Sequence, residues 1–187
     1  PHPEGSGINP ILLSSFIDFM RAEAALTLGT NEDPKTLLER GIRKSIDKVI
    51  SFKELVSEHM NTQYSNTGGG MSTLEELFVP DQEEIDKYVE FVLKSYDEAP
   101  TDGLKLDIIM KEYLIALWGN GIEAYNNYRR TCMPLNMQPT TEPVSGEFPG
   151  TLLLPAVHVN RNENIDPEQS LMKQPTFWDI NVSDCTR

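Results

Sequence analysis

The chain has 187 residues, which is long enough for one domain with a substantial hydrophobic core. Its formal net charge is −13, with 29 acidic residues against 16 basic ones, and this balance argues against nucleic-acid binding and against electrostatic attachment to an anionic membrane. We find no signal peptide and no apolar run long enough to span a bilayer in the printed sequence.

Two helices are predicted near the start of the chain. The first begins at Asn9-Pro10 or at Ser15, because both positions offer capping residues, and it ends at Gly29. Its predicted buried side carries residues at helical spacing, widened by two phenylalanines: Leu13, Ile17, Met20, Ala24 and Leu28, with Phe16 and Phe19.

The second helix is predicted to begin at Asp33-Pro34, where an acceptor side chain precedes a proline suited to the first helical position. Its predicted buried side consists of Leu38, Ile42, Ser45, Val49, Phe52 and Val56. Gly41 costs stability inside a helix, so we expect it to mark a close helix crossing. The two helices should form an antiparallel hairpin that resembles one tetratricopeptide unit, although no second copy follows at a fixed period.

The next part of the chain combines a loop with capped helices. Residues 60–71 have no periodicity and contain three consecutive glycines, so we expect an exposed loop. Ser72-x-x-Glu75 predicts the start of a short helical turn, and Asp81-x-x-Glu84 predicts the start of a longer helix. The longer helix should end at Ala99-Pro100 and bury one side: Ile85, Tyr88, Val89, Val92 and Tyr96.

The longest apolar passage begins at Leu104 and ends at Pro134. Its first half predicts a helix with two apolar stripes, Leu104, Ile108 and Ile115 on one and Leu106, Ile109, Tyr113 and Leu117 on the other. Only Lys105, Asp107, Lys111 and Glu112 offer a polar side, so this helix is expected to be buried. Gly119-Asn120-Gly121 should break it, and a second short helix with Ile122, Tyr125 and Tyr128 inward should follow.

The sequence changes in character after Pro134. Residues 134–176 contain seven prolines and little periodicity, which predicts a long, mostly irregular closing segment that lies across the helices. Residues 152–159 are expected to include a short extended piece interrupted by Pro155. The predicted anchors are Leu152, Leu154, Val157 and Val159, with Phe177 and Trp178 near the end. The fold class is therefore all-α, with helices in residues 10–132 and irregular structure in residues 133–187.

The sequence contains no catalytic or metal-binding motif, and it implies no cofactor. His2, His59 and His158 lack the spacing of metal ligands. Asn160, Asn162, Asn164 and Asp166 alternate as in a calcium loop, but Ile165 and Leu171 stand where that loop needs Gly and Glu. A polar loop with bonds from side chains to the backbone is the favoured interpretation. For Cys132 and Cys185 we expect two unpaired thiols, although an oxidising cell surface would permit a disulfide.

One aromatic residue is placed as a sugar-binding residue would be. Tyr64 lies in the polar loop, and a flat aromatic face can stack on the apolar C–H side of a pyranose ring. The neighbouring amides would fix the sugar hydroxyls. The candidate glycan site is therefore Tyr64, Gln63, Asn61 and Asn66. Trp118, Tyr125 and Tyr113 occur at helical spacing and are expected in the core instead.

Glu123, Arg129 and Arg130 form a second charged group of interest. A carboxylate and two guanidinium groups at a helix end could bind an anionic ligand. A structural ion pair is favoured, because the neighbouring residues are aromatics expected in the core.

The passage from Lys111 to Thr131 resembles the C-terminal signature of the SusD/RagB family of outer-membrane nutrient-binding lipoproteins. The matching residues are Ala116, Leu117, Trp118, Gly119, Asn120, Gly121, Glu123, Ala124, Tyr125, Tyr128, Arg129, Arg130 and Thr131. Residues 14–29, 37–50, 152–165 and 177–179 resemble further family segments in the same order. The chain departs from the family at Cys132, where Gly is usual, and at Pro149-Gly150 and Leu154-Pro155.

The resemblance implies a tetratricopeptide-like helical scaffold of which residues 1–187 are the C-terminal part, with the N-terminal part of the family domain absent. It implies a non-enzymatic, lipid-anchored protein exposed on the cell surface at the outer membrane, whose lipid anchor is not in this chain. Such a protein would capture oligosaccharides and deliver them to a SusC-like TonB-dependent transporter. The hallmark positions, implied to be structural, are Trp118, Gly119, Gly121, Glu123, Tyr125, Arg129 and Arg130.

Two other classes of function stay open. A helical-repeat scaffold that binds a protein or peptide would show an exposed apolar groove. A glycoside hydrolase or its accessory region would show two carboxyl groups facing each other across a cleft.

Overall fold

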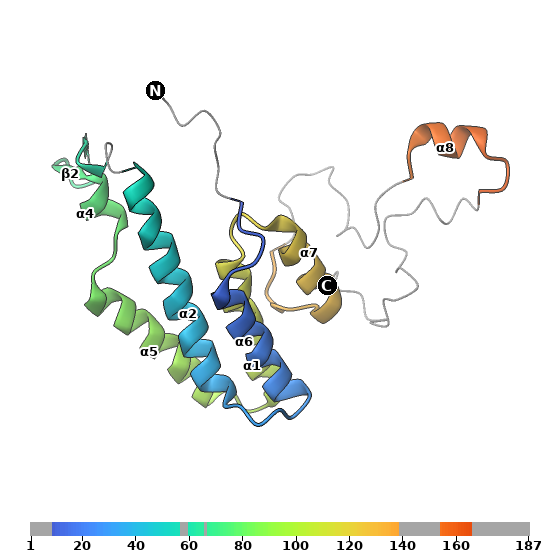
Figure 1. Cartoon of the computed structure of the whole chain (residues 1–187), viewed down its shortest axis with the longest axis horizontal. Helices are drawn as coiled ribbons and strands as arrows, with labels where there is room; N and C mark the ends of the chain where they lie inside the picture. The colour runs from blue at the N-terminus through green and yellow to red at the C-terminus, as the bar shows by residue number, and fades with distance from the viewer. Residues whose placement is uncertain (1–8, 57–59, 66, 139–153, 166–187) are drawn as a thin grey trace. The chain divides into compact units, whose positions relative to one another are not determined.

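The computed structural model describes residues 9–56, 60–65, 67–138 and 154–165, and these are mostly helical with two short strands (Figure 1). The all-α prediction is therefore confirmed. The chain divides into two compact units, residues 1–120 and residues 121–187. None of the described helices is both long enough and apolar enough to cross a membrane.

The first unit begins with a hairpin of two helices, as predicted. α1 (Ser14–Thr27) and α2 (Pro34–Ser51) lie side by side (Figure 1). Gly29 has φ +66° and turns the chain after α1, a conformation that glycine adopts without strain. Asp33 caps α2, because its carboxylate accepts a 2.9 Å hydrogen bond from the backbone N–H of Thr36. A short 3₁₀ helix, η1 (Phe52–Val56), follows α2.

The buried face of α1 differs from the predicted stripe. The helix buries Ser15, Phe16, Asp18, Phe19 and Ala22. The predicted core residues Ile17 and Met20 are more than one third exposed, and Leu28 is 79 % exposed. Phe16 and Phe19, which were also predicted on the buried side, are fully buried, and each ring removes a large apolar area from water. On α2 the buried residues are Leu37, Leu38, Gly41 and Ile42, whereas Val49 is 62 % exposed.

Gly41 allows the ring of Phe19 to come close to α2, as the sequence predicted. A Cβ atom added at Gly41 would lie 3.0 Å from Cζ of Phe19. A larger residue would therefore push the ring or the helix away. Phe19 also stacks on Tyr113, with ring centroids 5.4 Å apart, and Phe16 lies 5.8 Å from the same ring. These three rings form the centre of the core.

The loop after η1 contains a small hairpin that the sequence did not predict. β1 (Gln63–Ser65) pairs with β2 (Met71–Thr73) in antiparallel register, so that Tyr64 is opposite Ser72. α4 (Leu74–Phe78) follows directly. Its capping box uses Thr73 and Glu76, one residue later than predicted, and Thr73 is also the last residue of β2.

The last two helices of the first unit complete the core. α5 (Gln82–Glu98) begins with the predicted capping box of Asp81 and Glu84 and ends at Ala99. It buries Ile85, Val89, Val92 and Tyr96, but Tyr88 remains 38 % exposed. α6 (Asp102–Ala116) buries Ile109, Met110, Glu112 and Tyr113.

The prediction that both apolar stripes of α6 are buried is wrong for one stripe. Leu104 is 40 % exposed and Ile115 is 54 % exposed. The predicted polar side is also incomplete, because Glu112 is only 5 % exposed. Its carboxyl group accepts a hydrogen bond from Tyr88 on α5, and this bond offsets part of the cost of burying it.

The second unit contains α7 (Gly121–Thr131) and α8 (Ala156–Arg161). In α7 Tyr128 is buried as predicted, whereas Ile122 is 75 % exposed. The extended piece expected in residues 152–159 is wrong where the structure describes it, because α8 is helical, and Val157, a predicted anchor, is 65 % exposed. Cys132 forms a disulfide, so the expectation of an unpaired thiol at this position is wrong. Leu152, Phe177, Trp178 and Cys185 lie outside the described residues.

Candidate functional site

The candidate glycan site lies on the β1–β2 hairpin. Tyr64 is in the middle of β1 and is 43 % exposed, and Asn61 and Gln63 are exposed beside it. Asn66, the fourth predicted residue, lies outside the described residues. The hairpin therefore presents an aromatic ring on a paired strand, which gives the ring a more defined position than a free loop would.

The strand geometry changes which side chains can act together with Tyr64. Successive side chains of a strand point to opposite faces, so Gln63 and Tyr64 lie on different faces of the hairpin. Directly opposite residues share a face, and the partner of Tyr64 is Ser72. Ser72 is thus the hydroxyl on the same face as the ring. Ser72 was predicted to be a helix cap, and the glycine run before Met71 is the sequence signal that could have indicated a hairpin.

The turn between α6 and α7 holds the backbone before α1. Gly119 has φ +90°, which favours glycine. Asn120 is buried, and its Nδ2 donates a 3.3 Å hydrogen bond to the carbonyl oxygen of Ile11. Asn120 therefore connects this turn to the backbone before α1. Tyr113 is buried as predicted, but Trp118 is 91 % exposed and its prediction as a core residue is wrong.

The charged residues of α7 make local contacts. The guanidinium of Arg129 lies 5.2 Å from the centre of the Tyr125 ring, which is a cation–π contact. Arg130 Nη2 donates a 3.2 Å hydrogen bond to Oδ1 of Asn127. These contacts favour the structural interpretation of the arginines over an anion site. The ion pair with Glu123 stays a prediction.

Asp18 is the most enclosed carboxylate described in the first unit, and it is bound by cations from α2. Its Oδ1 lies 2.5 Å from Arg40 Nη2 and its Oδ2 lies 2.6 Å from Lys44 Nζ, with Arg21 at 3.6 Å. Burial alone would raise the pKa of Asp18, but the hydrogen bonds from Arg40 and Lys44 lower it below the usual value. A carboxylate held in this way stabilises the α1–α2 pair and is a poor proton acceptor.

Glu112 is the second buried carboxyl group. Its Oε2 accepts a 2.6 Å hydrogen bond from the hydroxyl of Tyr88 on α5. Burial raises the pKa of Glu112, and the bond from Tyr88 and the charge of Lys111 lower it in part. Burial and the same bond raise the pKa of Tyr88. Asp18 and Glu112 are each enclosed by their own partners, so neither is presented to a substrate.

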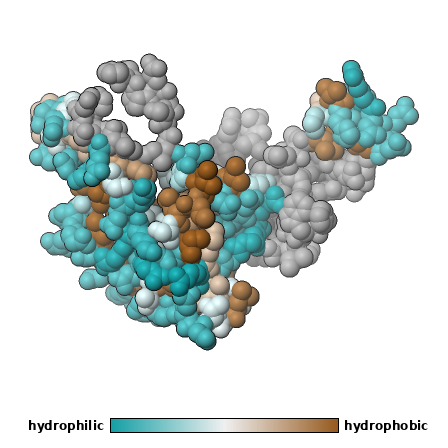
Figure 2. Space-filling view, in the orientation of Figure 1, coloured by the Kyte–Doolittle hydropathy of each residue, from teal (hydrophilic) through white to brown (hydrophobic). Residues whose placement is uncertain are grey.

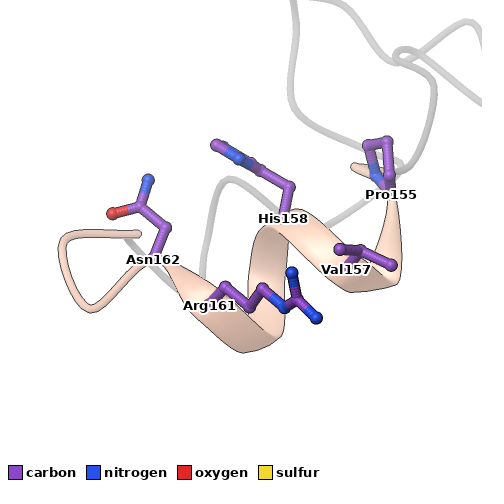
Figure 3. A pocket seen from close by; sticks show the side chains of 5 residues that line it. All are labelled: Pro155, Val157, His158, Arg161 and Asn162. Atoms are coloured by element: carbon purple, nitrogen blue, oxygen red, sulfur yellow. The ribbon is translucent and has the colours of Figure 1, made fainter.

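A concave region of about 610 Å³ lies along α8 and is lined by Pro155, Val157, His158, Arg161 and Asn162 (Figure 3). The side chains of His158 and Asn162 extend from one side of this short helix, and those of Val157 and Arg161 extend from another. They do not converge on one point, so the region lacks the grouped polar atoms of a small-molecule site. The predicted polar loop begins here, and Asn162 Oδ1 accepts a 3.1 Å bond from the N–H of Asn164. In the described ranges no three His, Cys, Asp or Glu residues form a metal site.

Comparisons with known proteins give consistent results. A family model described as SusD-like, the Susd and RagB outer membrane lipoprotein family, matches residues 9–176. A solved structure described as "Bacteroidetes AC2a SusD-like" has 23 % sequence identity and a TM-score of 0.50, and the match covers 73 % of this chain and 22 % of that one. This likeness shows the fold, and the chain spans less than a quarter of the length of that protein. No curated protein matches the sequence.

Proposed function

Because the chain belongs to the SusD/RagB family of outer-membrane lipoproteins, we propose that it is part of a protein that captures oligosaccharides at the cell surface without breaking bonds. Residues 1–187 would form the C-terminal part of a larger SusD-like domain, since the match spans 22 % of the solved relative. The full protein would be lipid-anchored at the outer membrane. It would pass its ligand to a SusC-like TonB-dependent transporter.

The observation that supports capture is the exposed ring of Tyr64 on a paired strand, with Ser72 opposite it on the same face. An aromatic face stacks on the apolar side of a sugar ring, and a hydroxyl beside it can exchange hydrogen bonds with the sugar. This arrangement suits a neutral oligosaccharide. Asp18 and Glu112 are enclosed, so neither of these two carboxyl groups faces a glycosidic bond.

The test is calorimetric titration of the intact mature protein with a panel of soluble polysaccharides: amylopectin, xyloglucan, arabinan, dextran and inulin. The Tyr64→Ala variant should lose affinity for the polysaccharide that the wild type binds, and Tyr64→Phe should retain most of it. Met71→Ala is the matched control, because Met71 is 63 % exposed and lies on the opposite face of the hairpin. Unchanged affinity in Tyr64→Ala would remove Tyr64 from the site.

A second candidate function is a scaffold that binds a protein or peptide, and an apolar strip on the first unit favours it. Exposed aliphatic side chains run along α1 and the segment before it: Ile11, Leu12, Ile17 and Met20. Figure 2 shows this hydrophobic strip in the middle of the visible face. In a larger SusD-like domain the same strip would pack against the rest of the fold. Replacing both Ile17 and Met20 with alanine in the intact protein distinguishes partner binding from packing within the domain. Only packing within the domain predicts that the double variant has a lower thermal stability.

A further inference from the structure

α5 carries two neighbouring aromatic side chains that are partly exposed to solvent, and neither belongs to the β1–β2 hairpin. Tyr88 is 38 % exposed and Phe91 is 63 % exposed. Residues three apart in a helix are neighbours on its surface, so these two rings lie next to each other. Single exposed aromatics are common on protein surfaces, but an adjacent pair of large rings is a less usual feature.

The hydroxyl end of the Tyr88 ring is fixed by a contact with α6. Its hydroxyl donates a 2.6 Å hydrogen bond to Glu112, which is only 5 % exposed. A ring fixed at its polar end has fewer rotamers to lose when a ligand stacks on its face. The exposed part of the ring is therefore the apolar face and edge, while the hydroxyl is already engaged.

The surroundings of the pair are charged and polar. Lys87 and Lys94 lie one turn to either side of Phe91, and their side chains are 67 % and 74 % exposed in ion pairs with Glu83 and Glu98. Ser95 completes the rim, with its hydroxyl donating to the carbonyl oxygen of Phe91. An apolar helix packed on this surface would remove these charges from water at a cost. A sugar would not, because its hydroxyls can bond to the same groups.

We propose that Tyr88 and Phe91 form a second glycan-binding surface on α5, which stacks on a pyranose ring of the polysaccharide while the rim groups bind its hydroxyls. This inference rests on the proposed capture function and extends it. A long polysaccharide can contact two separated aromatic surfaces on one protein, and each contact then raises the effective concentration of the ligand at the other.

The experiment uses the intact mature protein and the polysaccharide of the panel that binds it most tightly. Phe91→Ala and Phe91→Leu should each lower the affinity about fivefold, which is the scale of one aromatic contact, and Phe91→Tyr should stay within about twofold. Leucine keeps apolar volume and removes the flat face, so the comparison isolates stacking. Val49→Ala is the control, because Val49 is 62 % exposed and lies on α2.

The outcomes separate this inference from the capture function. If the wild type binds and Tyr64→Ala weakens binding while the Phe91 variants do not, the second surface is wrong and the capture function stands. If the wild type binds no polysaccharide, both are wrong. If Phe91→Ala lowers the thermal midpoint markedly, or weakens binding to a partner protein with glycan affinity unchanged, Phe91 packs against protein and the inference is overturned.

Discussion

The hydroxyl of Tyr88 on α5 donates a 2.6 Å hydrogen bond to Oε2 of Glu112 on α6. This bond connects two helices that are consecutive in the chain, and it lets a carboxyl group lie among apolar side chains with only 5 % of its surface exposed. Burial raises the pKa of Glu112 above its usual value, so the folded state favours the protonated form more than the unfolded chain does.

The contribution of Glu112 to the free energy of unfolding should depend on pH. The contribution of Glu112 to stability is fully present below its usual pKa of 4.5 and is lost as pH rises through the raised pKa. Glu112→Gln removes the charge and keeps an oxygen that can accept the Tyr88 bond. The variant should match the wild type at about pH 4 and have the higher free energy of unfolding at about pH 8. Urea denaturation at both pH values measures this, and a wild type that gains on the variant as pH rises would contradict it.

A companion variant tests the hydrogen bond itself. Tyr88→Phe leaves the buried carboxyl group without this donor, and it should lower the free energy of unfolding by about 1–3 kcal/mol. The loss should be larger at about pH 8 than at about pH 4, because an ionised carboxylate is costlier to bury than a neutral one. Equal losses at both pH values would show that the carboxyl group does not titrate across this range in the folded protein.

The close contact between Phe19 and Gly41 predicts a position that cannot accept alanine. The added methyl group would lie 3.0 Å from the ring, and such overpacking costs about 1–3 kcal/mol, more than the helix propensity that alanine gains. Gly103→Ala in α6 is the matched control, because the nearest atom to its added Cβ is 3.9 Å away. Thermal unfolding should show a lower midpoint for Gly41→Ala and an equal or higher one for Gly103→Ala. The reverse order would refute the close crossing.

The contribution of Asp18 to stability should depend on pH in the opposite direction to that of Glu112. Its lowered pKa means that its contribution to stability is present above the usual value of 3.8 and is lost as pH falls through the lowered pKa. Asp18→Asn should cost about 1–3 kcal/mol at neutral pH, and the difference from the wild type should shrink in acid. The cost is limited because the partner side chains are 41–44 % exposed and can return to water.

An exposed ion pair provides the control for Asp18. Asp97 accepts a 2.6 Å hydrogen bond from Lys35, and both side chains are well exposed. Asp97→Asn should therefore change the free energy of unfolding by less than about 0.5 kcal/mol. If both substitutions had the same effect, the buried position of Asp18 would have no energetic consequence.

Trp118 tests the proposal that residues 1–187 are part of a larger domain. In the 187-residue chain its side chain is 91 % exposed, so in a Trp178→Phe background its fluorescence should be quenched by acrylamide almost as strongly as free tryptophan. In the intact protein with Trp118 as its one remaining tryptophan, the quenching should fall, because the rest of the domain would cover an exposed tryptophan. Equal quenching in the two proteins would count against the larger domain.

Several start and stop signals of the helices could be predicted from the sequence, because each depends on a few adjacent residues. The start of α1 was not among them, since its N-cap position is Leu13, whose side chain makes no capping bond. Asp33, Asp81 and Gly29 act as caps where they were expected. The face that a helix buries depends on its neighbours instead. On α1, Phe16 and Phe19 are buried as predicted, but Ile17 is not. Glu112, predicted on a polar side, is buried where Tyr88 of another helix donates a hydrogen bond to it.

The candidate site was predicted less completely than the fold. Tyr64 is exposed as expected, but its companion on the same face is Ser72 rather than Gln63. That relation depends on the register of a hairpin whose strands have three residues each, too short for a periodic signal in the sequence. Trp118 was assigned to the core from helical spacing, yet it follows the end of α6, where the spacing no longer applies.

The most direct test of the account is titration of the intact mature protein with the polysaccharide panel, followed by an assay of each mixture for new reducing ends. We expect binding to one class of glycan, a loss of affinity in Tyr64→Ala, and no new reducing ends. New reducing ends would contradict capture without cleavage, and binding to peptides but to no polysaccharide would contradict glycan capture itself.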